Sequence, residues 1–275
     1  MTTAAPQLED FVERMIEADG FKIRYWESGT DQGQPPLVVI HGAGGPQGNA
    51  GGALELLAKQ HRVIAFELPG FGRSEPNTRT ANGREMAATL ASAMAALKID
   101  KYSISGTSMG GIIVLWWAVD FPKNVISVVL EVPSAFRANT VRPANLMTDR
   151  DVFIRAFHGR PERKPWLADF KPAVPANWDL VTKIMGGDRD EALAKKLPTI
   201  EAPVLALMGT KDAIISPDEG RHYKELIQNC YLMMVYGAAH DLKGDRPEAF
   251  ADVVGDFLTH GPKFLVRHQS TVINP

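Results

Sequence analysis

The sequence predicts an α/β fold, a mostly parallel eight-stranded sheet with helices on both faces. Short β-branched segments alternate along the chain with longer segments of helical periodicity. Several of the short segments are apolar throughout, which is typical of parallel strands covered on both sides by helices. The chain has 275 residues, of which 45% are hydrophobic, and this is enough for a large core.

The alternation assigns each element in order. Strands are expected over residues 11–16, 21–26, 37–40, 63–66, 102–104, 125–130, 204–208 and 231–235. Helices are expected over residues 53–58, 83–97, 110–119, 218–227 and 247–258. The first two strands are expected to pair antiparallel at one edge of the sheet.

One segment breaks the alternation. Residues 133–198 contain no clear strand, and prolines recur at positions 143, 161, 165, 172 and 175. The segment is too long for a plain connection between two strands. We expect a mostly helical cap insertion over 133–198, covering the end of a core domain formed by 1–132 and 199–275.

Composition limits the partners and the setting. The net charge of −2 gives no reason to expect nucleic acid or membrane binding. Residues 1–20 are acidic and lack the features of a signal peptide, and a lone cysteine, Cys230, suits a reducing compartment. A cytoplasmic protein is therefore expected, with Cys230 as a buried structural thiol because it opens an apolar strand.

Gly106-Thr107-Ser108-Met109-Gly110 matches the pattern G-x-S-x-G. An apolar strand precedes it and a helical segment follows, which is the setting of a nucleophile elbow. Such a turn holds the serine in a strained backbone conformation at the N-terminus of a helix, where developing negative charge is favoured. Ser108 is therefore the candidate nucleophile.

Two further motifs precede the elbow, each after a strand: His41-Gly42-Ala43-Gly44-Gly45-Pro46 and Glu67-Leu68-Pro69-Gly70-Phe71-Gly72-Arg73-Ser74. Their order and spacing resemble the α/β-hydrolase superfamily from about residue 21 to residue 258. The resemblance implies a serine hydrolase whose oxyanion hole is formed by the backbone N–H groups of Met109 and Ala43. His41 is expected to hold the glycine-rich loop rather than to act in catalysis.

The resemblance also sets the order in which a base and an acid should follow the serine. His240 follows the last expected strand in a loop of small residues, which favours it as the general base. His222 is expected on a solvated helix face and His260 at the end of the last helix. The acid has two candidates. Asp212 follows the strand at 204–208 in the usual superfamily position and is preferred.

The alternative acid is Glu131, at the end of the strand over 125–130. The segment Glu131-Val132-Pro133-Ser134 resembles the Glu-x-Pro-Thr segment of fungal zearalenone lactonases, which take their acid from that strand. A carboxylate is also unusual in a buried strand. Both candidates stay open at this point.

These features predict cleavage of a carboxylic ester or lactone through an acyl-enzyme on Ser108. No metal or other cofactor is expected. One alternative is carbon–carbon bond hydrolysis of a ring-fission product, a vinylogous β-diketone acid. The motifs His41-Gly-x-Gly and Ser108-Met109-Gly110-Gly111 also occur in such enzymes, but these usually carry Trp soon after the base, where this chain has Asp241-Leu242-Lys243. A ligand receptor of the same fold with little turnover is the other alternative.

The expected partner is a small-molecule ester or lactone, and a homodimer stays open. Gly44, Trp166 and Phe136 are candidate substrate contacts. The first half of the insertion is basic, and an arginine there is a candidate partner for a substrate carboxylate. These basic residues are Arg137, Arg142, Arg150, Arg155, Arg160, Arg163, Lys164 and Lys171.

Overall fold

The computed structural model describes residues 10–29, 33–46 and 52–266. Residues 1–9, which form part of the N-terminal segment considered above, and residues 267–275 lie outside the described ranges. Within those ranges no helix is both long and apolar enough to cross a membrane.

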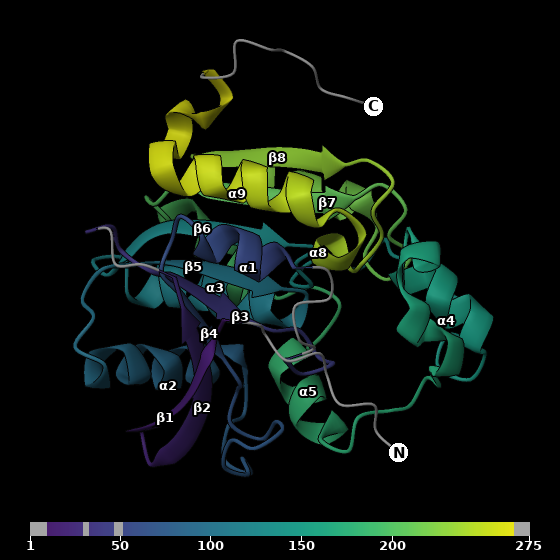
Figure 1. Ribbon diagram of the computed structural model, residues 1–275, viewed down its shortest axis with the longest axis horizontal. Coiled ribbons are helices and arrows are strands. Elements are labelled where there is room, and N and C mark those ends of the chain that lie inside the picture. The colour runs from purple at the N-terminus through teal and green to yellow at the C-terminus, as the bar shows by residue number, and fades with distance from the viewer. Residues whose placement is uncertain (1–9, 30–32, 47–51, 267–275) are drawn as a thin grey trace.

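The eight predicted strands form one sheet in the order β1-β2-β4-β3-β5-β6-β7-β8 (Figure 1). β1 pairs antiparallel with β2, and β2 antiparallel with β4, whereas all other neighbours are parallel, so the predicted architecture is confirmed. The strands are β1 (Val12–Ala18), β2 (Phe21–Ser28), β3 (Leu37–Ile40), β4 (Val63–Phe66), β5 (Tyr102–Thr107), β6 (Val125–Glu131), β7 (Val204–Gly209) and β8 (Cys230–Val235).

The helices follow the strands with small shifts from the expected bounds. They are α1 (Ala53–Ala58), α2 (Gly83–Ala96), α3 (Met109–Asp120), α4 (Arg150–Phe157), α5 (Trp178–Met185), α6 (Glu191–Ala194), α7 (Gly220–Leu226), α8 (Leu242–Asp245) and α9 (Pro247–His260). Short 3-10 helices are η1 (Pro161–Arg163), η2 (Pro165–Asp169), η3 (Leu197–Thr199), η4 (Pro217–Glu219) and η5 (Gly261–Val266). The short helix α8, directly after His240, was not predicted, because four residues carry too little periodicity.

The strands bury both of their faces. In β3, Leu37 and Val39 pack into a cluster with α1 and α9, whereas Val38 and Ile40 pack into a second cluster with α2 and α3. This follows from the two-residue repeat of a strand, which sends successive side chains to opposite faces. The result is a three-layer arrangement in which helices cover the sheet on both sides.

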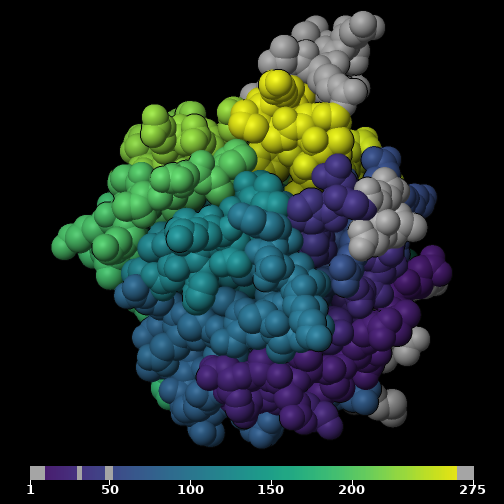
Figure 2. Space-filling view, turned by 90° about the vertical axis from the view of Figure 1, so that its left-hand side faces the viewer, coloured from purple at the N-terminus to yellow at the C-terminus, as the bar shows by residue number. Residues whose placement is uncertain are grey.

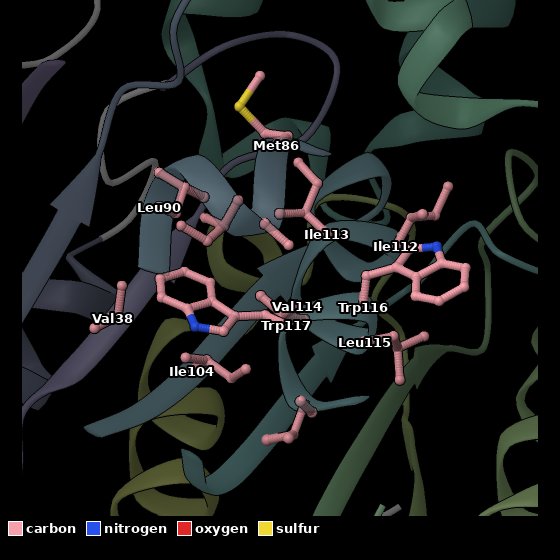
Figure 3. Packing of buried hydrophobic residues seen from close by; sticks show 14 of the residues in the cluster. Val38, Met86, Leu90, Ile104, Ile112, Ile113, Val114, Leu115, Trp116 and Trp117 are labelled. Carbon is pink, nitrogen blue, oxygen red and sulfur yellow. The ribbon is translucent and has the colours of Figure 1, made fainter. Parts of the chain in front are cut away.

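Helix α3 lies at the centre of the larger cluster, and its residues from Met109 to Ala118 are buried all round. Figure 3 shows Trp117 pointing from α3 toward Ile104, with Trp116 pointing the opposite way. The Trp117 indole N–H donates to the Tyr102 hydroxyl at 3.1 Å, so its polar atom is satisfied inside the core. The helix that begins at the candidate nucleophile is therefore fixed by a core that surrounds it.

The segment between β6 and β7 contains α4, α5 and α6 and three short 3-10 helices, but fewer than half of residues 133–198 are helical, so it is less helical than expected. Its buried side chains belong to the clusters of the core: Leu180 and Val181 of α5 join the cluster around α3, and Ala156 of α4 packs with Met208. In Figure 1, α4 lies on the side to which the arrowheads of β6 and β8 point. A separate cap domain over 133–198 stays a prediction.

The edges of the sheet lie far apart. Figure 2 shows the side of the molecule where the purple residues of β1 and β2 occupy one end and the yellow residues of α9 and η5 the other.

The free thiol of Cys230, in edge strand β8, is buried as predicted, and burial raises its pKa to about 12. Such a thiol is a packing group rather than a nucleophile.

Trp117→Ala should lower the free energy of unfolding by about 3–5 kcal/mol, because it leaves a large cavity beneath α3. Trp178→Ala in α5 is the matched control, since Trp178 is 40% exposed. Urea denaturation followed by circular dichroism measures both. Equal losses in the two variants would contradict the central place given to α3.

Candidate active site

Ser108 forms the turn between β5 and α3, with φ 53° and ψ −112°. A positive φ at a residue other than glycine costs on the order of 1–3 kcal/mol. Backbone hydrogen bonds hold it there: the Ser108 N–H donates to the Glu131 carbonyl at 2.8 Å, and the Ser108 carbonyl accepts from Gly111 at 2.9 Å. The predicted elbow is therefore present, and its serine is held in a fixed, strained position.

Two glycines make this turn sterically possible. A Cβ at Gly106 would lie 2.3 Å from the Gly110 carbonyl oxygen, and a Cβ at Gly110 would lie 2.6 Å from the carbonyl oxygens of Ile40 and His41. Both distances are far below van der Waals contact. The two glycines of G-x-S-x-G thus let α3 begin directly against β3.

The predicted oxyanion donors lie on two adjoining segments. Met109 is the first residue of α3, where backbone N–H groups have no partner within the helix. Ala43 follows β3 in a turn in which the Gly45 N–H donates to the Gly42 carbonyl at 3.2 Å. A Cβ at Gly42 would lie 3.3 Å from the Ser108 Cβ, so this loop passes directly beside the serine.

His41 holds the glycine-rich loop, as predicted. Its Nε2 lies 3.1 Å from the Leu68 N–H, which can only donate, so Nε2 accepts and the proton resides on Nδ1. Nδ1 then donates to the Gly42 carbonyl at 2.7 Å. Burial lowers the pKa of His41 to about 4, consistent with a neutral ring that joins the loop to the end of β4.

Asp212 and His240 form a hydrogen-bonded pair. Asp212 Oδ2 lies 2.8 Å from His240 Nδ1, and both residues are buried. The other carboxylate oxygen, Oδ1, accepts from the backbone N–H groups of Ile214 at 2.7 Å and Ile215 at 3.0 Å. These bonds orient the carboxylate toward the imidazole, and the arrangement leaves Nε2 as the atom that can exchange a proton with a nucleophile.

Glu131, the alternative acid, is bound to other groups. Its carboxylate accepts from the Ser105 hydroxyl at 2.6 Å and the Thr107 hydroxyl at 2.8 Å, and it pairs with the Lys243 ammonium at 3.0 Å. The ammonium also lies 3.2 Å from the Thr107 oxygen. Glu131 therefore supports the strand that leads into Ser108 and ties it to α8, which follows His240.

The candidate substrate contacts differ in their surroundings. Phe136 is buried, with its ring 5.0 Å from that of Tyr223, and its contact with substrate stays a prediction. Gly44 is exposed in the turn after β3, and Trp166 is 42% exposed. His222, expected in solvent, is partly buried against Phe136 and lies 3.3 Å from Glu219.

Three of the insertion's arginines are used structurally. Arg137 donates to the carbonyls of Ser134, Met185 and Gly186. In the same way Arg142 donates to Ile214, and Arg150 donates to Leu167 and Ala168. Backbone carbonyls are alternative acceptors for a guanidinium, so these three are poor candidates for gripping a substrate carboxylate.

Aromatic side chains of the insertion form a row of ring contacts that begins at the His240 imidazole. The Phe157 ring lies 5.2 Å from the imidazole at an interplanar angle of 89°, and Phe153 stacks on Phe157 at 4.1 Å. Phe170 and then Trp166 continue the series at 4.9 Å and 6.1 Å between ring centroids. We name Phe153, Phe157, Trp166 and Phe170 the aromatic series. All four are partly exposed, which makes an apolar surface next to His240.

Two lysines were not recognised as parts of the site. Lys243 lies three residues after His240 and reaches Glu131, and Lys164 is buried beside the same loop. The sequence does contain one sign of them: Asp241 follows His240 directly, and a carboxylate that is shielded from water needs a cation as its partner. In the described part of the chain, no cluster of His, Cys, Asp and Glu side chains forms a metal site.

A model of the alpha/beta hydrolase fold family matches residues 35–183, more than half of the chain. The chain therefore belongs to this family and is a hydrolase of that fold. Residues 35–183 hold the glycine-rich loop and the elbow, and the strand order and the geometry of Ser108 described above agree with that membership.

Among curated relatives, Lipase 3 of Moraxella sp. (strain TA144) is 28% identical over 266 residues, covering 90% of this chain and 83% of the relative. The 2-hydroxy-6-oxo-6-(2'-aminophenyl)hexa-2,4-dienoic acid hydrolase of Metapseudomonas resinovorans is 25% identical, covering 90% of this chain and 91% of that protein. A solved structure of a bacterial membrane phospholipase A has a TM-score of 0.76 at 23% identity, covering 92% of this chain and 87% of that one.

The neutral His41 predicts a pH dependence of stability. Its pKa falls from the ordinary value of 6.5 in the unfolded chain to about 4 in the fold. As pH falls from 6.5 toward 4, only the unfolded chain gains this proton, so the fold loses stability. Between pH 7 and pH 5, wild type should lose about 2 kcal/mol more unfolding free energy than His41→Gln. Urea titrations at both pH values test this, and equal losses would contradict it.

Proposed function

We propose that the protein hydrolyses a carboxylic ester or lactone through an acyl-enzyme on Ser108. The observation that carries the proposal is the His240–Asp212 pair at 2.8 Å, on the sheet edge where the strained Ser108 lies. The parallel strands β5, β7 and β8 all end at this edge, which brings the residues that follow them together. Lys243, on the helix that follows His240, reaches Thr107, the residue before the serine.

In this mechanism His240 Nε2 takes the Ser108 hydroxyl proton as Oγ attacks the substrate carbonyl. The backbone N–H groups of Met109 and Ala43 stabilise the oxyanion of the tetrahedral intermediate. His240 returns the proton to the departing alcohol, and the acyl group stays on Ser108. A water that loses its proton to His240 then releases the acid and restores the serine.

Asp212 is the acid of this triad. It holds the proton of the imidazole on Nδ1 and stabilises the imidazolium that forms during each step. Glu131 keeps a supporting role, because its carboxylate is already shared by two hydroxyls and an ammonium. Three parts of the chain, β6, β5 and α8, meet at that carboxylate.

The aromatic series suggests an apolar acyl or aryl group as the part of the substrate nearest the base. Phe157 contacts the His240 ring, and the neighbouring rings lead away from it along α4 and η2. Partly exposed aromatic surface of this kind is typical of the lining of small-molecule sites. We propose that the segment over 133–198 serves as a cap that supplies this surface.

Carbon–carbon bond hydrolysis is the second candidate, favoured by the Metapseudomonas resinovorans relative, which this chain matches over nearly its whole length. The arginine contacts weigh against it. Arg137, Arg142 and Arg150 donate to backbone carbonyls, so a substrate carboxylate would have to be bound by other groups.

The first test is steady-state hydrolysis of p-nitrophenyl esters of graded chain length, an aryl lactone and a vinylogous β-diketone acid. Ester or lactone turnover is expected, and Ser108→Ala should lower kcat by at least about 1,000-fold because the triad acts as a unit. Ser127→Ala is the control, since Ser127 is buried in the same sheet and bonds only to Ser103 among the contacts described.

Turnover of the diketone acid alone would favour the second candidate. Normal ester hydrolysis by Ser108→Ala would contradict the proposal. No turnover on any of the substrates by the folded protein would contradict it as well, and would favour a ligand receptor of the same fold.

The second test separates the two acids. Asp212→Asn should lower kcat by about 100- to 10,000-fold, because the amide can donate to Nδ1 and so favour the wrong imidazole tautomer. Glu131→Gln should lower it by less than about tenfold, since the amide oxygen can still accept from Thr107 and the amide NH2 can donate to the Ser105 hydroxyl, which also accepts. Circular dichroism checks that both variants fold. The reverse order of the two losses would move the acid to β6.

A further inference from the structure

Between the insertion and the loop that carries His240 lies a buried cluster of charged side chains. The ammonium of Lys164 is 2.7 Å from Asp241 Oδ2 and 2.6 Å from Asp245 Oδ1. It also lies 3.0 Å from His158 Nδ1. Lys164 is 4% exposed and Asp245 is fully buried. We call these four residues the lysine cluster.

Lys164 supplies the one lysine cation that lies between the two carboxylates of the lysine cluster. The ammonium donates to one oxygen of each carboxylate, and His158 Nδ1 lies beside both the ammonium and Asp241 Oδ2, at 3.0 Å and 3.3 Å. Burial raises the pKa of Asp241, but the hydrogen bond with His158 and the charge and hydrogen bond of Lys164 together hold this pKa well below its usual range. Without the ammonium, the fully buried Asp245 carboxylate would lie next to Asp241, whose side chain is 21% exposed, with no lysine between the two negative charges, which is unfavourable.

Asp245 joins the insertion to the histidine loop through backbone hydrogen bonds. Its Oδ2 accepts from Gly159 at 2.7 Å and from Ala239 at 2.8 Å, and its Oδ1 accepts from Arg160 at 3.2 Å. The two segments also touch directly. A Cβ at Gly159 would lie 2.3 Å from the Gly237 carbonyl oxygen, so only glycine allows this approach.

The cluster therefore holds the residues on both sides of His240. Ala239, before it, is bound by Asp245, and Asp241, after it, pairs with Lys164. The Asp241 N–H donates to the Phe157 carbonyl at 2.9 Å, and the Phe157 ring contacts the imidazole. Asp212 orients the His240 imidazole through Nδ1. The position of the His240 backbone, in contrast, depends on these contacts with the insertion.

We propose that Lys164 is a positioning residue for His240: its ammonium fixes the loop that carries His240 by bridging the carboxylates of Asp241 and Asp245. This inference rests on the proposed role of His240 as the general base. Lys164 acts only through the backbone on either side of the histidine. Its loss should reduce the rate of the chemical step, because small misplacements of a catalytic group cost about 10- to 100-fold in rate.

The test compares Lys164→Met with Lys183→Met. Lys183 is an exposed lysine of α5 in the same insertion. Lys164→Met should lower kcat by about 10- to 100-fold with little change in KM, whereas Lys183→Met should change neither. If Lys164→Met is too unstable to purify, Lys164→Gln removes the charge while keeping amide donors and carries the same expectation.

A spectroscopic measurement separates positioning from a general loss of stability. The proton shared by His240 Nδ1 and Asp212 should give a downfield ¹H NMR resonance in the folded wild type, identified by its absence in His240→Ala. This resonance should shift or broaden in the Lys164 variant at temperatures where circular dichroism shows it folded, and it should be unchanged in Lys183→Met.

The double variant Lys164→Met with Asp241→Asn tests the role of charge, because it removes one cation and one carboxylate and so restores the charge difference of the wild type. It removes one of the two facing carboxylates, and Asp245 still accepts three backbone hydrogen bonds. Recovery of most of the lost kcat is expected. A double variant as slow as Lys164→Met, or a single variant with wild-type kcat and an unshifted resonance, would overturn the inference. Ser108→Ala assayed alongside distinguishes this failure from failure of the proposed hydrolysis.

Discussion

The left-handed backbone of Ser108 is the constraint around which the site is organised. A positive φ at a side-chain-bearing residue persists only where neighbouring structure determines it, and here β3, β6 and α3 all contribute. Gly106 and Gly110 allow the backbones to meet, and Trp117 and its neighbours hold α3 in the core. Packing in the core thus sets the position of the Ser108 hydroxyl at the edge of the sheet.

The histidine, by contrast, sits on a short loop that has to be held from several directions. Asp212 reaches it from β7, Lys243 ties the following helix to Glu131 of β6, and Asp245 and Lys164 tie the loop to the insertion. Buried ion pairs add little net stability but fix geometry, because each charge is costly to leave unpaired. The two carboxylates considered as the triad acid therefore have different roles: Asp212 orients the imidazole, and Glu131 supports the turn at Ser108.

Periodicity and glycine patterns were enough to predict the sheet, its antiparallel edge and the elbow, because these depend on local spacing. Ser108, His240 and Asp212 could be proposed from their places after successive strands. Phe136 could not be placed, since an aromatic residue in an irregular segment carries no sign of which side it faces. Val132 has a positive φ of 43°, and its N–H donates to the Leu207 carbonyl, a partner distant in sequence. The burial of Lys164 also depends on a distant partner, Asp245. Contacts between the insertion and the histidine loop are set by tertiary packing alone.

The nucleophilic serine is tested most directly by labelling with a fluorophosphonate, which phosphonylates an activated serine and leaves a stable adduct. We expect intact-protein mass spectrometry to show one adduct per chain, and peptide mapping to place it on Ser108. Ser108→Ala should remain unlabelled, and His240→Ala should react far more slowly although its serine is intact. Stoichiometric labelling of Ser108→Ala, or an adduct mapped to another residue of the wild type, would contradict the account.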